Sequence, residues 1–257
     1  VKKGYPEVIF LSEAFTRPKI MYRLAKLGFT QSYTYFTWRN VKWELTEYFT
    51  ELTQTGVREF FRPNLWPNTP DILSDYLWDS GRPAFMTRLV LAATLGASYG
   101  IYGPAYELGE NRRKDKESEE YLDSEKYELK QWNIESPNSL KDFIARVNGI
   151  RRENTALQND HSLRFHSVDN DQLICYSKRT EDLSNVILVV VNLDYQDKQS
   201  GWVDLSPEEL GIDTGKLYKV HDLLADTTYQ WQDARNYVEL DPGKVPAHIF
   251  QIDQRIT

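Results

Sequence analysis

The feature that most restricts the fold of this chain is a change of pattern near residue 155. Before it, short apolar runs alternate with segments of helical periodicity, which is typical of an α/β sheet or barrel. After it, β-prone runs are separated by turns rich in Asp, Asn, Gly and Pro, which predicts an antiparallel β-sandwich of about 100 residues. We therefore expect two domains, 1–154 and 155–257.

The α/β part contains too few strand–helix units to close a barrel. Strands are expected over 7–12, 31–36, 58–62 and 97–102, and helices over 19–27, 40–53, 84–95 and 139–153. A complete (β/α)8 TIM barrel takes about 250 residues, and half of one would leave sheet edges unpaired. We expect 1–154 to be the C-terminal half of such a barrel, followed by the all-β antiparallel sandwich domain. The other half would lie upstream of Val1.

Composition argues against several classes of function. The formal net charge of −7 over 257 residues disfavours nucleic-acid binding. The longest apolar runs, such as 186–191, are too short to cross a membrane. Cys175 is the one cysteine, which suits a reducing, cytoplasmic location. The four histidines show no ligand spacing, so we expect no metal site, and no cofactor motif is present.

The first candidate for chemistry is Glu13, which follows the expected strand 7–12. Barrel active sites are built at this carboxyl end of the strands. Apolar neighbours would raise the pKa of Glu13, as a general acid at neutral pH requires. An ion pair between Glu13 and Arg17 is the structural alternative, and this segment by itself does not decide between the two.

The second candidate is Asp71, in the run Asn68-Thr69-Pro70-Asp71 after the expected strand 58–62. A helix start capped by Asn68 or Thr69 would explain this run without any catalytic role. Two carboxylates on alternate strands at one end of a barrel are, however, what glycosidic chemistry uses. Glu13 and Asp71 together therefore indicate such a site.

Five segments then resemble the α-1,4-glucan:maltose-1-phosphate maltosyltransferases, a subgroup of glycoside hydrolase family 13, the α-amylase superfamily. They are PEVIFLSEAFTRP (6–18), SYTYFTWRN (32–40), LWPNTPDIL (65–73), YGIYGPAYELGEN (99–111) and YLDSEKYELK (121–130). Ordinary amylases have an Asn-His-Asp motif where this chain has Asn68 to Asp71. The absent histidine favours the maltosyltransferase subgroup.

The resemblance implies a role for each matching residue. Glu13 corresponds to the general acid/base, and Asp71 to the second carboxylate, which stabilises the transition state. Lys126 and Tyr127 correspond to a pair that contacts the non-reducing end of the maltosyl unit.

Two further residues are expected to bind substrate. Asn68 belongs to the same motif as Asp71. Arg17 would contact the donor phosphate or orient Glu13.

The implied reaction moves a maltosyl group from α-maltose 1-phosphate to the non-reducing end of an α-1,4-glucan, with retention of configuration and release of phosphate. The family's nucleophilic Asp belongs to an Arg-x-Asp motif, which we expect upstream of Val1. This chain by itself is therefore expected to be inactive and to need the N-terminal half of the same protein. Full-length members are expected to form homodimers.

Two other interpretations stay open at this point. Another enzyme of the α-amylase family, such as a hydrolase or a trehalose synthase, would use the same carboxylates. A non-catalytic glucan-binding module would instead use the abundant aromatic side chains to hold sugar.

Overall fold

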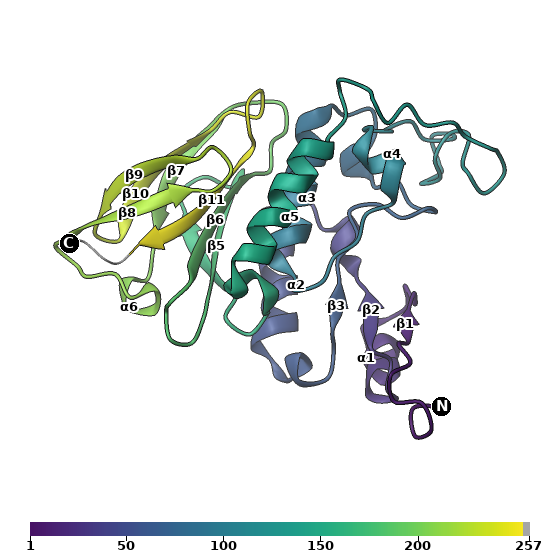
Figure 1. The fold of residues 1–257 in the computed structure, drawn as a ribbon, viewed down its shortest axis with the longest axis horizontal. Coiled ribbons are helices and arrows are strands. Elements are labelled where there is room, and N and C mark those ends of the chain that lie inside the picture. Colours follow the sequence, from purple (N-terminus) through teal and green to yellow (C-terminus); the bar gives the residue numbers. More distant parts are fainter. Residues whose placement is uncertain (254–257) are drawn as a thin grey trace.

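A parallel sheet forms the N-terminal part of the computed structural model, which describes residues 1–253 (Figure 1). Its strands β1 (Leu11–Ser12), β2 (Gln31–Tyr33) and β3 (Pro63–Asn64) lie in sequence order. A parallel bridge from Leu65 to Tyr99 adds one further position beside β3. The expected alternation of parallel strands and helices is therefore present, while closure into a barrel remains a prediction.

The helices of this part are mostly where periodicity predicts them. They are α1 (Pro18–Lys26), α2 (Lys42–Gln54), α3 (Arg82–Leu95), the short α4 (Gly103–Glu107) and α5 (Lys141–Glu153). Single turns of 3₁₀-helix cover Tyr35–Trp38, Gly56–Glu59, Asp75–Leu77 and Thr155–Gln158. Pro18 stands in the first turn of α1, where a missing N–H costs no hydrogen bond.

The strand expected over 58–62 is wrong. The Thr55 hydroxyl accepts a hydrogen bond from the Val57 N–H, and the Phe60 N–H bonds back to the Val57 carbonyl. These local bonds form the turn Gly56–Glu59, so the chain pairs with β2 only from Pro63 onward.

The strand expected over 7–12 is shorter and more exposed than predicted. Pairing with β2 covers Leu11 and Ser12 only. Ile9 and Leu11 are 67% and 53% exposed, although their apolar run predicted a strand buried on both faces. Among residues 1–253, β1 has a neighbour on one side and none on the other. The parallel sheet therefore ends at β1 in an exposed apolar edge that no described strand covers.

The C-terminal part is antiparallel, as predicted, and forms one continuous eight-stranded sheet in the order β10-β7-β4-β5-β6-β11-β8-β9. The strands are β4 (Arg164–Val168), β5 (Leu173–Arg179), β6 (Val186–Asn192), β7 (Gln199–Asp204), β8 (Leu217–Asp222), β9 (Thr227–Gln232), β10 (Arg235–Leu240) and β11 (Ala247–Asp253), and one short helix, α6 (Pro207–Leu210), lies between β7 and β8. The two separate sheets of a sandwich are joined here because β4 pairs with β5 through Arg164–His166 and with β7 through Ser167 and Val168.

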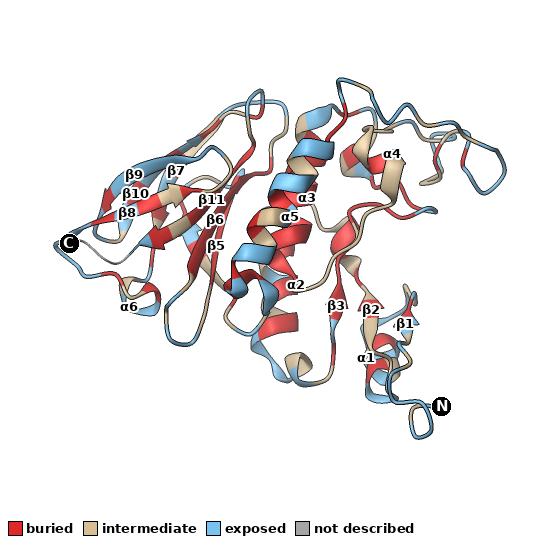
Figure 2. Ribbon diagram, viewed as in Figure 1, coloured by how far each residue is buried: buried red, intermediate tan, exposed pale blue. Residues whose placement is uncertain are grey.

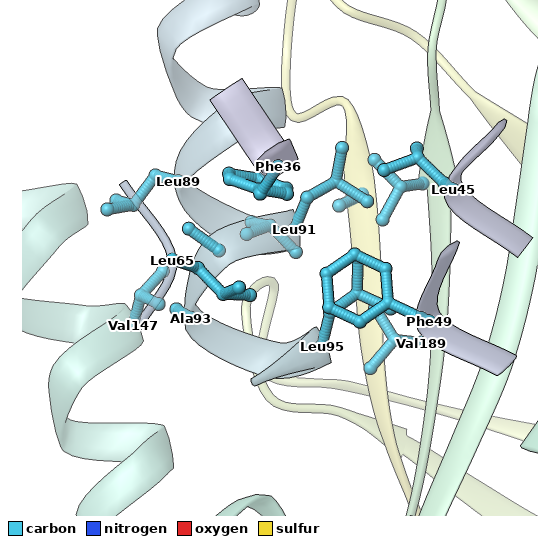
Figure 3. Close-up of a cluster of buried hydrophobic side chains, with 14 of the residues drawn as sticks. Phe36, Leu45, Phe49, Leu65, Leu89, Leu91, Ala93, Leu95, Val147 and Val189 are labelled. Atoms are coloured by element: carbon cyan, nitrogen blue, oxygen red, sulfur yellow. The ribbon is translucent and has the colours of Figure 1, made fainter. Parts of the chain in front are cut away.

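Strands β5 and β6 are buried on both faces and join the two parts. Cys175 and Val190 face the interior of the curved sheet, while Tyr176 and Val189 belong to the core around α3. Figure 3 shows Val189 beside Phe49 and Leu95, and Figure 2 shows buried residues on β5, β6 and the helices next to them. One hydrophobic core therefore crosses the expected domain boundary at 154/155.

No helix within residues 1–253 is long and apolar enough to span a membrane.

A buried histidine in β4 makes the fold sensitive to acid. His166 Nε2 lies 2.7 Å from the Ser177 hydroxyl, and burial lowers the pKa of His166 from an ordinary 6.5 to about 4. The folded state therefore holds this imidazole neutral, whereas the unfolded chain binds a proton near pH 6.5.

We expect this difference to reduce the free energy of unfolding as pH falls from 6.5 to 4, by about 3 kcal/mol at most. Chemical denaturation of the wild type and of His166→Gln at pH 7 and pH 4 measures it, and the wild type should lose more stability. The exposed His161→Gln serves as the matched control. Equal losses in the wild type and His166→Gln would contradict the assignment.

Candidate active site

The carboxyl ends of β1 and β3 bring the two predicted catalytic carboxylates to the same end of the sheet. Glu13 follows Ser12, the last residue of β1, and Asp71 lies in the loop after Asn64, which ends β3. The carboxyl ends of parallel strands lie at the same end of a sheet, which is the upper end in Figure 1. Tyr33 ends the intervening β2. Burial, and to a smaller extent the charge of Glu13, raises the pKa of the Tyr33 hydroxyl, so Glu13 and Tyr33 are electrostatic neighbours.

The surroundings of Glu13 differ from those expected. Its side chain is exposed, so residues 1–253 do not supply the apolar enclosure that was expected around it. Arg17 is also exposed and, among residues 1–253, forms no ion pair or hydrogen bond with Glu13, so the ion pair considered as the structural alternative is absent there. Contact of Arg17 with a donor phosphate and orientation of Glu13 by Arg17 both stay predictions.

The loop that carries Asp71 is a tight turn, and the alternative of a helix start is wrong. The backbones of Thr69 and Ile72 bond to each other, with N···O distances of 3.0 and 3.3 Å, and Asn68 and Leu73 form an antiparallel bridge on either side. The Thr69 hydroxyl accepts the Asp71 N–H at 3.2 Å. This geometry directs the Asp71 side chain outward, where it is 48% exposed.

Asn68 anchors this turn to the interior of the protein. Its side chain is fully buried, and its Nδ2 donates to the Tyr121 hydroxyl at 2.8 Å. Its Oδ1 accepts the Tyr102 N–H, also at 2.8 Å. Both ends of the amide are thus occupied within the protein. What the structure displays is a positioning role, and direct substrate contact by Asn68 stays a prediction.

Lys126 joins a distant segment to this turn through an ion pair with Asp71. The same ammonium group lies 3.2 Å from Glu120 Oε1. Tyr127 follows with a side chain that is 70% exposed, and Lys114 lies 5.7 Å from the centre of its ring. The structure therefore brings Asp71 together with Lys126 and Tyr127, which lie more than fifty residues further along the chain, at one end of the sheet.

Several neighbours of the site were missed from sequence. The run 112–120 is densely charged, a composition typical of a solvated loop, but Glu119 accepts the Trp38 indole N–H at 2.7 Å and its carbonyl accepts the Leu73 N–H, also at 2.7 Å. Glu125 accepts hydrogen bonds from the Tyr102 hydroxyl and the Trp132 indole, which lower the pKa of Glu125. The sequence signal for these contacts is the mixture of acidic and aromatic residues over 119–132, which a count of charges does not reveal.

Aromatic rings pack against one another on the segments at the carboxyl ends of β1, β2 and β3. Tyr33 and Trp66 have ring centres 5.0 Å apart, and Phe15 packs edge-on against Trp38 at 5.0 Å. Gly100 makes room for Trp66, because a Cβ there would lie 2.5 Å from the indole ring. Flat apolar faces beside carboxylates suit a sugar ring, which carries C–H patches surrounded by hydroxyls.

Among residues 1–253, no three His, Cys, Asp or Glu side chains are placed to hold a metal ion. The titratable side chains described at this end of the sheet are carboxylates, an ammonium group and phenols.

Comparison with solved structures places the fold among the α-amylases. An α-amylase from Anoxybacillus matches with a TM-score of 0.67 and 14% identity, over 100% of this chain and 55% of the other. A noncanonic maltogenic α-amylase from Thermotoga neapolitana matches with a TM-score of 0.66 and 14% identity, over 98% and 56%. At such low identity these matches describe the fold alone.

Sequence comparison is more specific. A family model described as "GLGE, C-terminal" matches residues 165–252. The α-1,4-glucan:maltose-1-phosphate maltosyltransferases of Methylacidiphilum infernorum and Chlorobaculum tepidum are each 51% identical, over 99% and 98% of this chain. A Streptomyces coelicolor member is 52% identical over 96%. The chain spans 37 to 38% of the length of these curated relatives.

Five sequence segments, an amylase-like fold and near-50% identity over almost all of its residues agree on one assignment. The chain belongs to the family of the α-1,4-glucan:maltose-1-phosphate maltosyltransferases and corresponds to a C-terminal stretch of its members.

Proposed function

We propose that this chain is part of a retaining glycosyltransferase that moves maltosyl units from α-maltose 1-phosphate to the non-reducing end of α-1,4-glucans. The observation that carries the proposal is the ion pair between Lys126 and Asp71 at the carboxyl end of the parallel sheet. It links the two motifs to which the family resemblance gives substrate-binding and transition-state roles. The family's printed name supplies the donor and the acceptor.

In this proposal the two carboxylates have different tasks. Glu13 assists departure of the phosphate from the anomeric carbon and then accepts the proton of the attacking acceptor hydroxyl. Asp71 lies beside Lys126 and binds sugar hydroxyls, and its carboxylate favours the positively charged, oxocarbenium-like transition state. The ion pair with the Lys126 ammonium group fixes the position of the Asp71 carboxylate.

The nucleophile of the proposed reaction lies outside this chain. Retention of configuration takes a covalent glycosyl intermediate, formed on a carboxylate close to the general acid. We place this group, an aspartate, in the segment upstream of Val1. The unpaired edge of β1, with Ile9 and Leu11 exposed, supports the proposal that upstream strands complete the sheet there. The same strands would enclose Glu13.

The first test is release of phosphate from α-maltose 1-phosphate with maltotetraose as acceptor. We expect none from the 257-residue chain, and release once the upstream segment of the Methylacidiphilum infernorum relative is supplied. The products, resolved by mass spectrometry, should be acceptors longer by two glucose units. Glucan hydrolysis without phosphate release would transfer the assignment to an amylase-type hydrolase, and release by the isolated chain would contradict the position of the nucleophile.

A second test replaces the proposed acid/base in the complemented protein. Glu13→Gln should lower kcat by about 10²- to 10⁴-fold, because the amide can neither give nor accept the proton. Glu7→Gln, an exposed glutamate in the same segment, is the matched control and should leave kcat unchanged. A Glu13→Gln variant with the activity of Glu7→Gln would refute the assigned role.

A third test removes the partner of Asp71. Lys126→Met should lower kcat/KM by about 10- to 100-fold, the range expected for a charged hydrogen bond in a site. The exposed Lys116→Met, on the neighbouring loop, is the control. Equal kinetics for the two variants would show that the Lys126–Asp71 pair has no part in the reaction.

A further inference from the structure

The helix α2 carries an exposed tryptophan that the proposed reaction does not use. Trp43 lies in the first turn of α2 and is 67% exposed. Leu45, Phe49 and Leu52 form the buried face of the helix, and Trp43 projects from another face. Within residues 1–253 its indole N–H has no hydrogen-bond partner and its ring packs on no other aromatic ring. A large apolar surface is thus left in water with a free donor.

Trp43 borders two hollows in the surface. The larger, of about 890 Å³, is bordered by α2, Tyr76 and the β-domain residues Asp171 and Leu193. The smaller, of about 290 Å³, is bordered by Arg39, Tyr48 and further residues of α2. Trp43 and Glu47 border both. The larger hollow falls within the range of about 300–1,000 Å³ that is typical of ligand sites.

Glu47 supplies the polar half of this surface. It stands four residues after Trp43, so both side chains share one face of the helix. Glu47 is exposed and, among the described residues, has no hydrogen-bond or ion-pair partner. An aromatic ring can stack on the C–H face of a sugar, and a free carboxylate can accept hydrogen bonds from a pair of its hydroxyls. Trp43 and Glu47 thus provide two elements of carbohydrate recognition.

The charge of the surroundings disfavours an anionic occupant. Glu44, Glu47 and Glu51 line the smaller hollow, and Asp171 borders the larger. The cation Lys42 is already used, since its ammonium group donates to the carbonyls of Val168 and Asn170 at 2.9 and 3.0 Å. Nucleic acid and sugar phosphates would be repelled here, whereas a neutral glucan would not.

The surface also faces the same end of the molecule as the candidate active site. The chain enters α2 from the carboxyl end of β2, so the first turn of α2 lies at that end of the sheet. Asn40 Nδ2 donates to Asp75 Oδ1 at 2.7 Å, which ties the start of α2 to the segment that follows Asp71.

We propose that Trp43 and Glu47 form a second α-glucan-binding surface, separate from the reaction centre, which holds a distant part of a long acceptor chain. The inference rests on the proposed function for the identity of the polymer only. Trp43 stacks on one glucosyl unit, Glu47 accepts hydrogen bonds from its hydroxyls, and the flanking hollows receive the neighbouring units. Such a surface raises the local concentration of chain ends at the active site.

Affinity electrophoresis of the 257-residue chain in gels containing glycogen tests the proposal. Trp43→Ala should weaken retardation about tenfold, a change equivalent to about 1.4 kcal/mol. Glu47→Gln should weaken it less, and Trp43→Phe should retain most of it. Trp202→Ala, which removes a tryptophan that is 43% exposed on β7, is the matched control and should bind as the wild type does. Thermal unfolding of each variant confirms that it is folded.

The proposal would be overturned if the wild type were not retarded, or if Trp43→Ala and Trp202→Ala were retarded equally. It would also be overturned if sedimentation showed that the wild type is a dimer and that Trp43→Ala is a monomer. The last would assign the surface to a second copy of the chain.

In the complemented protein, Trp43→Ala should slow transfer to glycogen and leave transfer to maltotetraose unchanged. Loss of transfer to both acceptors would place Trp43 in the reaction centre instead. If the proposed function itself fails, no variant transfers maltosyl groups, while the difference in glycogen binding between Trp43→Ala and Trp202→Ala persists.

Discussion

The structure depends on the burial of helix α3 between two sheets. Every residue of α3 from Ala84 to Leu95 is buried, with the parallel strands on one side and β5 and β6 on the other. Arg88 is buried within it and donates to the carbonyls of Phe36 and Arg39 at 2.6 and 2.7 Å. Because those carbonyls end the turn that leads into α2, α3 also positions the loop beside the candidate site. Burial lowers the pKa of Arg88 to about 10, which leaves it charged at neutral pH.

The burial of α3 also connects the β domain to the parallel sheet that carries the candidate site. The face of β5 and β6 that meets α3 includes Tyr176, whose hydroxyl lies 2.6 Å from the Thr94 hydroxyl. Lys178, also on β5, is fully buried and pairs with Asp160 at 3.2 Å. Asp160 in turn accepts the Ala97 N–H at 2.6 Å, next to the parallel bridge at Tyr99. The β domain thus supports the last segment of the parallel sheet through polar contacts as well as apolar ones.

Sequence patterns predicted the elements whose neighbours are local or fully apolar. The helix expected over 84–95 agrees with α3, and the apolar run 186–191 lies within β6 of the expected antiparallel domain, because both runs are buried on all sides. Glu13 and Asp71 could be placed at one end of the sheet because each follows a strand. The pattern failed at 58–62, where side-chain and backbone bonds of a turn outweigh β propensity. Sequence patterns also could not reveal the hollow beside Trp43 or the contact between Glu119 and Trp38, because each brings together segments that lie far apart in sequence.

We propose that β1 ends the described sheet at an edge that upstream strands complete. Hydrogen exchange of the backbone amides of residues 9–13, measured on this chain with and without the upstream segment of the Methylacidiphilum infernorum relative, tests this proposal. We expect rapid exchange in the isolated chain and strong protection once that segment is present, because its strand would hydrogen-bond to the free edge of β1. Unchanged exchange at 9–13 in a complemented and active protein would contradict it.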